Sequence, residues 1–146
     1  MIDCIVLGDS IAVGTQLQRY ECVSYAKGGI NSSQWNKQFG NKDLTAGTVI
    51  ISLGTNDHKY VKTEQELLAM RAKINALKVF WILPVGNSPK SEVPLEVIQN
   101  TVKKIATSYG DVVLPITRVQ ADGIHPSWAG YKDISEKTKY FTKEIK

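Results

Sequence analysis

The sequence predicts an α/β fold built on a parallel sheet. Short, nearly continuous apolar runs of strand length alternate along the chain with stretches of helical apolar spacing, which is typical of β-α units. Strands that are apolar throughout are buried on both faces, so helices should cover the sheet on each side. Because crossovers are right-handed, few topologies remain. We favour a flavodoxin-like three-layer α/β/α sandwich with a five-stranded parallel sheet of order 2-1-3-4-5.

Five segments have the composition of buried strands. The clearest is rich in β-branched residues. The expected strands are Ile2–Leu7, Glu21–Ala26, Thr48–Leu53, Lys78–Leu83 and Asp111–Leu114.

Four segments have helical patterns. One of them starts with Thr63–Glu66, which has the sequence of a capping box. The expected helices are Ser10–Tyr20, Thr63–Leu77, Ser91–Tyr109 and a last one from about Ser127 to Ile145.

Length and composition fit one domain covering residues 1–146, with 42% hydrophobic and 22% charged residues. No apolar stretch approaches the roughly 20 residues of a membrane-spanning helix. The N-terminus carries no secretory signal pattern. We therefore expect a cytoplasmic protein, although delivery elsewhere by another route stays open.

The net charge is +4. The lysines are scattered, which indicates a solvated surface rather than a nucleic-acid-binding stripe, while an anionic polymer substrate stays open. Two cysteines do not make a disulfide framework. Cys4 and Cys22 lie in apolar segments, and we expect them to be small, unpaired, buried hydrophobic side chains. The spacing of Cys and His predicts no metal site, and no motif indicates a cofactor.

A serine follows the first expected strand directly, in Gly8–Ser10. At the turn into a helix, Ser10 would project from the sheet edge near free helix amides, where negative charge is favoured. A serine hydroxyl needs a base within hydrogen-bond reach to become a nucleophile. The alternative is that Ser10 merely caps the helix.

The base can come from the other end of the chain, in Asp122–Pro126. His125 precedes a proline suited to the first turn of a helix. Asp122 could approach one ring nitrogen across the turn and leave the other facing Ser10. The three residues together predict a Ser-His-Asp hydrolase.

Two further segments at the same sheet edge can donate hydrogen bonds to an oxyanion. Gly29 offers an unobstructed backbone amide, and Asn56 offers a side-chain amide. The alternatives are a plain turn at Gly28–Gly29 and an Asx turn or helix cap at Asn56–Asp57.

Four segments of the chain match, in order, the marker blocks of a known family. They are Gly8–Ser10 followed by Ile11, Ala26–Asn31, Gly54–Asp57, and Asp122–Pro126 followed by Ala129–Tyr131. The chain thus resembles the SGNH hydrolase superfamily, also called GDSL-type esterases and lipases.

This resemblance implies that Ser10 is the nucleophile, His125 the general base and acid, and Asp122 its orienting partner. It also implies an oxyanion hole formed by the amides of Ser10 and Gly29 and the side chain of Asn56. Gly28 is the second candidate for the glycine donor.

Other residues have candidate roles around this site. His58 could border the substrate pocket, and Trp128 could either wall it or pack in the core. Trp35 and Trp81 are interpreted as packing residues. Asp9 is expected to bond backbone near the serine rather than to transfer protons.

The leading functional hypothesis is a serine esterase that removes short acyl groups, above all acetyl, through an acyl-enzyme. Short loops imply an open site, so O-acetyl groups on polysaccharide or peptidoglycan are plausible substrates. The alternatives are a lysophospholipase or thioesterase, and a non-catalytic carbohydrate-binding module on a retained hydrolase fold. The sequence indicates no nucleic-acid partner and leaves the oligomeric state open.

Overall fold

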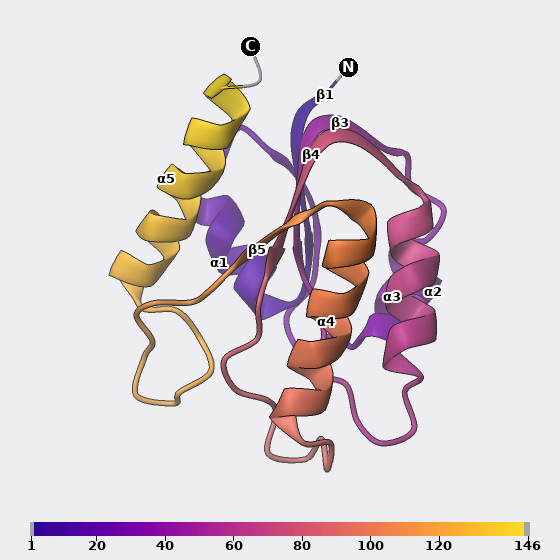
Figure 1. Cartoon of the computed structure of the whole chain (residues 1–146). Helices are drawn as coiled ribbons and strands as arrows, with labels where there is room; N and C mark the ends of the chain where they lie inside the picture. Colours follow the sequence, from indigo (N-terminus) through magenta and orange to yellow (C-terminus); the bar gives the residue numbers. More distant parts are fainter. Residues whose placement is uncertain (1, 145–146) are drawn as a thin grey trace.

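The computed structural model of the chain describes residues 2–144 and contains the predicted five-stranded parallel sheet. The strands lie in the order β2-β1-β3-β4-β5, which confirms the predicted topology. They are β1 (Ile2–Gly8), β2 (Val23–Ala26), β3 (Leu44–Ser52), β4 (Ile74–Ile82) and β5 (Val112–Leu114). Their carboxyl ends point to the lower edge of the sheet in Figure 1.

Helices cover both faces of the sheet, as predicted (Figure 1). On one face, α1 (Ser10–Gln18) packs beside α5 (Trp128–Glu144). On the other lie α2 (Ser32–Phe39), α3 (Thr63–Ala72) and α4 (Leu95–Tyr109). None of the helices described between residues 2 and 144 is both long and apolar enough to cross a bilayer.

Each face of the sheet has its own apolar core. Trp35 and Trp81 are fully buried in the core under α2, α3 and α4, which confirms their interpretation as packing residues. The second core joins Phe80 of the sheet to Ile11 of α1 and Ile134 of α5. Burying large side chains of this kind contributes about 1.5–3 kcal/mol each, so both layers are firmly attached to the sheet.

Helix α3 is shorter than predicted, because it ends at Ala72 rather than at Leu77. The segment from Ile74 onward belongs to β4, and Ile74 pairs with Leu44 of β3. Pairing with a neighbouring strand outweighs the local helical spacing here. Two other helices are shorter than predicted at one end. Helix α1 ends at Gln18 rather than at Tyr20, and α4 begins at Leu95 rather than at Ser91. The predicted end at Ile145 lies outside the described residues.

The capping box predicted at the start of α3 is wrong. The Thr63 hydroxyl instead donates to Asp57 Oδ2 at 2.7 Å, and the helix begins without a side-chain cap. A capping box does form at α2, a helix that the sequence analysis did not predict. There Asn31 Oδ1 accepts from the Gln34 amide at 2.9 Å, and Gln34 Oε1 accepts from the Asn31 amide at 3.0 Å.

A disulfide joins Cys4 in β1 to Cys22 just before β2. Both side chains are buried, as expected, but the interpretation as unpaired small side chains is wrong. The parallel register pairs Ile5 with Val23, so the preceding residues, Cys4 and Cys22, lie opposite each other with their Cα atoms 4.8 Å apart. The crosslink ties the edge strand β2 to the central part of the sheet.

Reducing this disulfide should lower the free energy of unfolding. Opening a loop closed between residues 18 positions apart restores chain entropy to the unfolded state, worth about 3 kcal/mol. Urea denaturation with and without reductant measures the difference, and the double variant Cys4→Ser/Cys22→Ser should show no effect of reductant. Equal midpoints for oxidised and reduced wild type would contradict the crosslink.

The turn between β1 and α1 is held against the end of β3. Gly8 has a φ of +137°, and a Cβ there would lie 1.8 Å from the Ser52 carbonyl oxygen, so only glycine fits. The Asp9 amide donates to that same oxygen at 2.9 Å. Asp9 Oδ1 accepts from the Ile11 amide and the Ser52 hydroxyl, each at 3.0 Å. Asp9 therefore caps α1, as its predicted backbone role required.

The Asp9 carboxyl is fully buried, and its Oδ2 has no hydrogen-bond partner. Burial raises the pKa of Asp9 from 3.8 to about 7, although the hydrogen bonds from Ser52 and Ile11 oppose this shift. The folded protein thus binds a proton here at pH values at which the unfolded chain has released it.

The stability of the wild type should therefore fall as the pH rises from about 4 to about 7. In that window the folded state holds more protons than the unfolded state, and the full difference is on the order of 4 kcal/mol. Asp9→Asn keeps the acceptor oxygen and should remove this part of the pH dependence. Denaturant midpoints measured at pH 4.5 and pH 8 for both proteins provide the check. Parallel pH profiles for the two proteins would argue against a proton on Asp9.

Candidate functional site

Three side chains from opposite ends of the chain form a continuous hydrogen-bonded series. Ser10 Oγ lies 2.7 Å from His125 Nε2, and His125 Nδ1 lies 2.7 Å from Asp122 Oδ2. All three residues are partly accessible, with 33% of the His125 side chain and 42% of the Asp122 side chain exposed. The group that the sequence placed at one sheet edge is thus assembled and open to solvent.

The loop that carries Asp122 and His125 is braced along its length. The Gln120 amide donates to the His125 carbonyl at 2.8 Å, and the Ser127 amide donates to the Arg118 carbonyl at 3.0 Å. Asp122 Oδ1 accepts from the amides of Ile124 and His125 at 2.9 and 3.0 Å. These bonds make the loop a narrow hairpin that holds the imidazole in place.

The environment of Asp122 keeps its carboxylate ionised. The hydrogen bonds from the Ile124 amide and from His125 lower the pKa of Asp122 to about 2. An ionised carboxylate accepts hydrogen bonds only, so Nδ1 of His125 carries the proton between them. In the neutral form of the ring, Nε2 is then an acceptor for the Ser10 hydroxyl.

Backbone amides without a partner lie in the segments next to Ser10. Ser10 is the first residue of α1, where amides have no partner within the helix. Within residues 2–144, the amides of Ser10, Gly28 and Gly29 donate no bond to another residue. A Cβ on Gly28 would lie 3.9 Å from Ser10 Cβ, and Gly29 has a φ of +77°. The glycine turn therefore leaves its amides accessible beside the serine.

Asn56 also faces this glycine turn. Its Nδ2 donates to the Ile30 carbonyl at 3.1 Å. A primary amide has two N–H groups, so one remains for a ligand. The bond to Ile30 fixes the orientation of the Asn56 side chain relative to Gly29.

The buried side chain of Asp57 holds the segments of this arrangement together. Its buried carboxylate accepts from the Ser32 amide at 2.8 Å and from the Thr63 hydroxyl at 2.7 Å. It thus joins the loop after β3 to the starts of α2 and α3. Burial raises the pKa of Asp57 above its ordinary value despite these hydrogen bonds. Neither the Asx-turn interpretation nor a simple cap describes this bridging role.

Sequence reasoning assigned no individual role to two residues that support the site. Ser52, whose hydroxyl bonds Asp9, is the polar end of an apolar strand, and that was the available signal. Tyr131 packs so closely on α1 that a Cβ at Gly14 would lie 2.5 Å from its hydroxyl. Burial and the charges of Asp9 and Asp122 raise the pKa of Tyr131 to about 12, so the phenol stays neutral.

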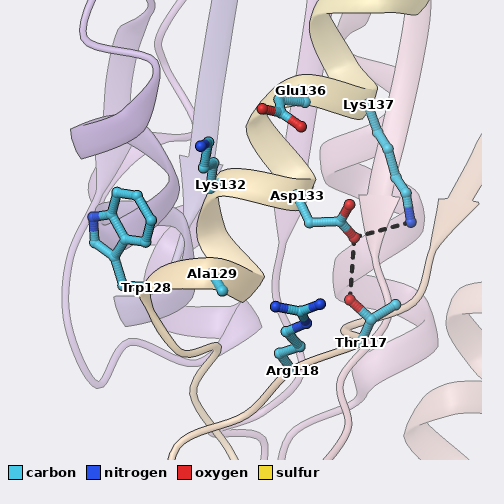
Figure 2. A pocket seen from close by; sticks show the side chains of 8 residues that line it. All are labelled: Thr117, Arg118, Trp128, Ala129, Lys132, Asp133, Glu136 and Lys137. Carbon is cyan, nitrogen blue, oxygen red and sulfur yellow. Dashed lines mark hydrogen bonds and ion pairs between the residues drawn. The ribbon is translucent and has the colours of Figure 1, made fainter.

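The two residues expected to bind substrate lie in different surroundings. His58 is half-buried and lines a cavity of about 380 Å³ beside the start of α2. Trp128 is 69% exposed, which excludes the core-packing alternative. It lies at one end of a second cavity of about 600 Å³ along α5 (Figure 2). Ser10 lines neither cavity.

No protein-family model matches the sequence, and no curated protein is similar to it. Solved structures do resemble the fold. A protein described as an acylhydrolase from Bacteroides fragilis has a TM-score of 0.71 at 18% identity, covering 99% of this chain and 88% of its own. A member of the lipolytic G-D-S-L family from Veillonella parvula has a TM-score of 0.68 at 15% identity, covering 96% and 97%.

A third similar structure is the C-terminal catalytic domain of a peptidoglycan O-acetyltransferase from Streptococcus pneumoniae. Its TM-score is 0.64 at 13% identity, covering 97% of this chain and 94% of that domain. These likenesses extend over nearly the whole chain. They agree with the five-stranded parallel sheet and its strand order. The chain therefore has the fold of the SGNH hydrolase superfamily, to which the GDSL-type lipolytic proteins belong.

Proposed function

We propose that the protein is a serine esterase that removes short acyl groups, above all acetyl, from larger molecules. The observation that carries the proposal is the unbroken series from Ser10 Oγ through His125 to Asp122, with both contacts at 2.7 Å. A hydroxyl bonded to a neutral imidazole, which is itself oriented by a carboxylate, is the arrangement that activates a serine.

The reaction follows from the positions of the protons. Ser10 Oγ attacks the acyl carbonyl carbon while its proton passes to His125 Nε2, and Asp122 stabilises the imidazolium. The tetrahedral intermediate collapses, the C–O bond to the alcohol breaks, and His125 returns the proton to the leaving oxygen. Water then attacks the acyl-enzyme with His125 again accepting a proton, which releases the acid and restores Ser10.

The negative charge on the former carbonyl oxygen needs fixed donors. We assign these to the amides of Ser10 and Gly29 and to the free N–H of Asn56, with Gly28 as the alternative glycine. The support is that these amides lack partners within the described chain, while Asn56 is held by Ile30. Each such donor is commonly worth about 3 kcal/mol of transition-state stabilisation.

The preference for small acyl groups rests on the openness of the site. About a third of the His125 side chain is exposed, and Ser10 does not line the cavities along α5, α2 and α3. A long acyl chain would gain little from such a surface, since its binding energy depends on buried apolar area. The similarity in fold to a peptidoglycan O-acetyltransferase domain is in keeping with acetyl groups on a glycan.

The cellular location stays a prediction. The sequence favoured the cytoplasm, but the disulfide between Cys4 and Cys22 is a bond that persists mainly in oxidising compartments. We propose that the folded protein acts in such a compartment.

Removing either the Ser10 hydroxyl or the His125 imidazole should abolish hydrolysis. Ser10→Ala and His125→Ala should each lower kcat for p-nitrophenyl acetate by at least about a thousandfold, because the nucleophile or its base is lost. The control is Ser108→Ala at the end of α4, which should retain full activity. Circular dichroism and urea midpoints check that the variants are folded. Full activity in folded Ser10→Ala would overturn the mechanism.

The acyl preference is tested with nitrophenyl esters of increasing chain length. We expect kcat/KM to be highest for acetate and to fall steadily from butyrate to octanoate, because no apolar pocket covers the longer chains. A maximum at octanoate or above would favour the lysophospholipase alternative. A preference for acyl thioesters over the matched oxygen esters would favour the thioesterase.

The non-catalytic alternative makes a different prediction. A carbohydrate-binding module on this fold would not need a reactive hydroxyl, whereas the esterase should be labelled covalently by a fluorophosphonate probe at Ser10. Intact-protein mass spectrometry measures the adduct, and Ser10→Ala is the control. Folded wild-type protein that is never labelled, yet binds glycans, would replace the esterase proposal with the binding one.

A further inference from the structure

Two neighbouring cavities lie along the start of α2, on the glycine-turn side of Ser10. The first, of about 280 Å³, is lined by Lys27, Gly28 and Gly29 among others. The second, of about 380 Å³, is lined by His58, Tyr60 and Lys62 among others. Gln34 lines both. We call the pair the α2 groove, since both cavities lie against this helix and share Gln34 as a wall.

The α2 groove begins next to the reactive hydroxyl. Gly28 lines its first cavity, and a Cβ on this residue would be 3.9 Å from Ser10 Cβ. The bond from Asn56 to the Ile30 carbonyl fixes the wall between the groove and the end of β3. A substrate whose acyl group reaches Ser10 can therefore extend along α2 toward Tyr60.

An exposed aromatic side chain marks the far end. Tyr60 is 80% exposed, yet it is not isolated, because its ring lies edge-on to His58 at 6.1 Å between centroids. The Tyr60 amide donates to His58 Nδ1 at 3.2 Å. Tyr60 thus lies at the solvent-exposed end of the groove. A tyrosine ring has an apolar face and a polar hydroxyl, so it is suited to cover the apolar face of a sugar ring.

The charge of the groove is positive. Lys27, Lys37 and Lys62 line it, and none of them forms an ion pair within the described chain. One carboxylate, Glu66, also lines the groove and accepts a bond from Asn36 Nδ2 at 2.8 Å, so the groove keeps an excess of positive charge. Three unpaired ammonium groups along one path favour an anionic ligand.

The cavity along α5 has less of this bias. There Asp133 pairs with Lys137 at 3.1 Å and accepts from Thr117, and Glu136 adds a second negative charge (Figure 2). Lys132 lies over the Trp128 ring at 5.4 Å. The cavity's three cations, Arg118, Lys132 and Lys137, face two carboxylates, which leaves a smaller positive charge than in the α2 groove and makes it a weaker candidate for an anionic ligand.

We propose that the α2 groove binds a carboxylate-bearing glycan chain, with Tyr60 covering one sugar ring and Lys37 and Lys62 meeting its carboxylates. The bound chain presents an O-acetyl group to Ser10. This inference rests on the proposed esterase function and narrows its substrate to acidic acetylated glycans. The carboxylates can belong to uronic acid residues or to the lactyl and peptide groups of peptidoglycan.

Activity on polymers tests the groove. The measured quantity is the ratio of kcat/KM on O-acetylated polygalacturonate to kcat/KM on p-nitrophenyl acetate. Tyr60→Ala and the double variant Lys37→Gln/Lys62→Gln should each lower this ratio about tenfold. Tyr20→Ala, which changes an equally exposed tyrosine at the opposite end of α1 (84% exposed), and Lys103→Gln on α4 are the matched controls and should leave it unaltered.

The dependence of the rates on substrate charge and on salt concentration provides a second test. Wild type should favour acetylated polygalacturonate over neutral acetylated xylan, and raising NaCl from 0.05 to 0.5 M should erase that preference, because screening weakens the lysine contacts. O-acetylated peptidoglycan in the same assay distinguishes the two sources of carboxylate. Equal rates on the acidic and neutral polymers at low salt would overturn the proposal.

Direct binding separates this inference from the esterase proposal. Calorimetry with Ser10→Ala and de-esterified oligogalacturonate should show binding that weakens about tenfold when Lys37→Gln/Lys62→Gln is added. Loss of nitrophenyl acetate hydrolysis in wild type with this binding intact would overturn the esterase and keep the groove. Hydrolysis without any lysine-dependent binding would overturn the groove and keep the esterase.

Discussion

The carbonyl oxygen of Ser52 is the point on which the site depends. It accepts the Asp9 amide at the end of β3, and it leaves no room for a side chain on Gly8. Two parallel strands and the first helix are thereby fixed against one another within a single turn. Ser10 follows at once, so its hydroxyl emerges at the sheet edge in one orientation. Asp9, buried and with a raised pKa, contributes stability through this turn only at the cost of an unsolvated carboxyl group.

Asp122 and His125 are brought to Ser10 by the loop that follows β5. The strand β5 is short, and the chain after it folds into the braced hairpin that ends at α5. Because α5 packs against α1, this hairpin lies beside the N-terminus of α1, where Ser10 is the first residue. The contact between Ser10 and His125 is therefore a consequence of helix packing and not of any local preference.

The charged groups differ between two regions beside the sheet edge, one around His125 and the other along α2. Around His125, backbone amides concentrate on Asp122 and hold it ionised near an exposed surface. Along α2, by contrast, ammonium groups without partners outnumber the carboxylates. A proposed reactive centre that holds one ionised carboxylate, beside a positively charged groove, suits a substrate that is neutral at its ester and anionic elsewhere.

The sequence by itself predicted the sheet order, the layers and the meeting of Ser10, Asp122 and His125, because apolar runs set which segments are buried and the marker segments stand at strand ends. It also identified Gly29 and Asn56, whose backbone and side-chain amides remain available. Local pattern was a poor guide where two structures competed: Ile74 has helical spacing from α3 but joins β4, and Thr63 bonds Asp57 instead of its own helix.

Only the tertiary structure decided the features that depend on register and long-range contact. Cys4 and Cys22 meet because β1 and β2 pair at one particular register, which two separate apolar segments do not encode. The same holds for the bond of Ser52 to Asp9 and for the groove that joins Gly28 to Tyr60. Each is made by residues far apart in the chain, so its geometry exists only once the sheet has brought their backbones together.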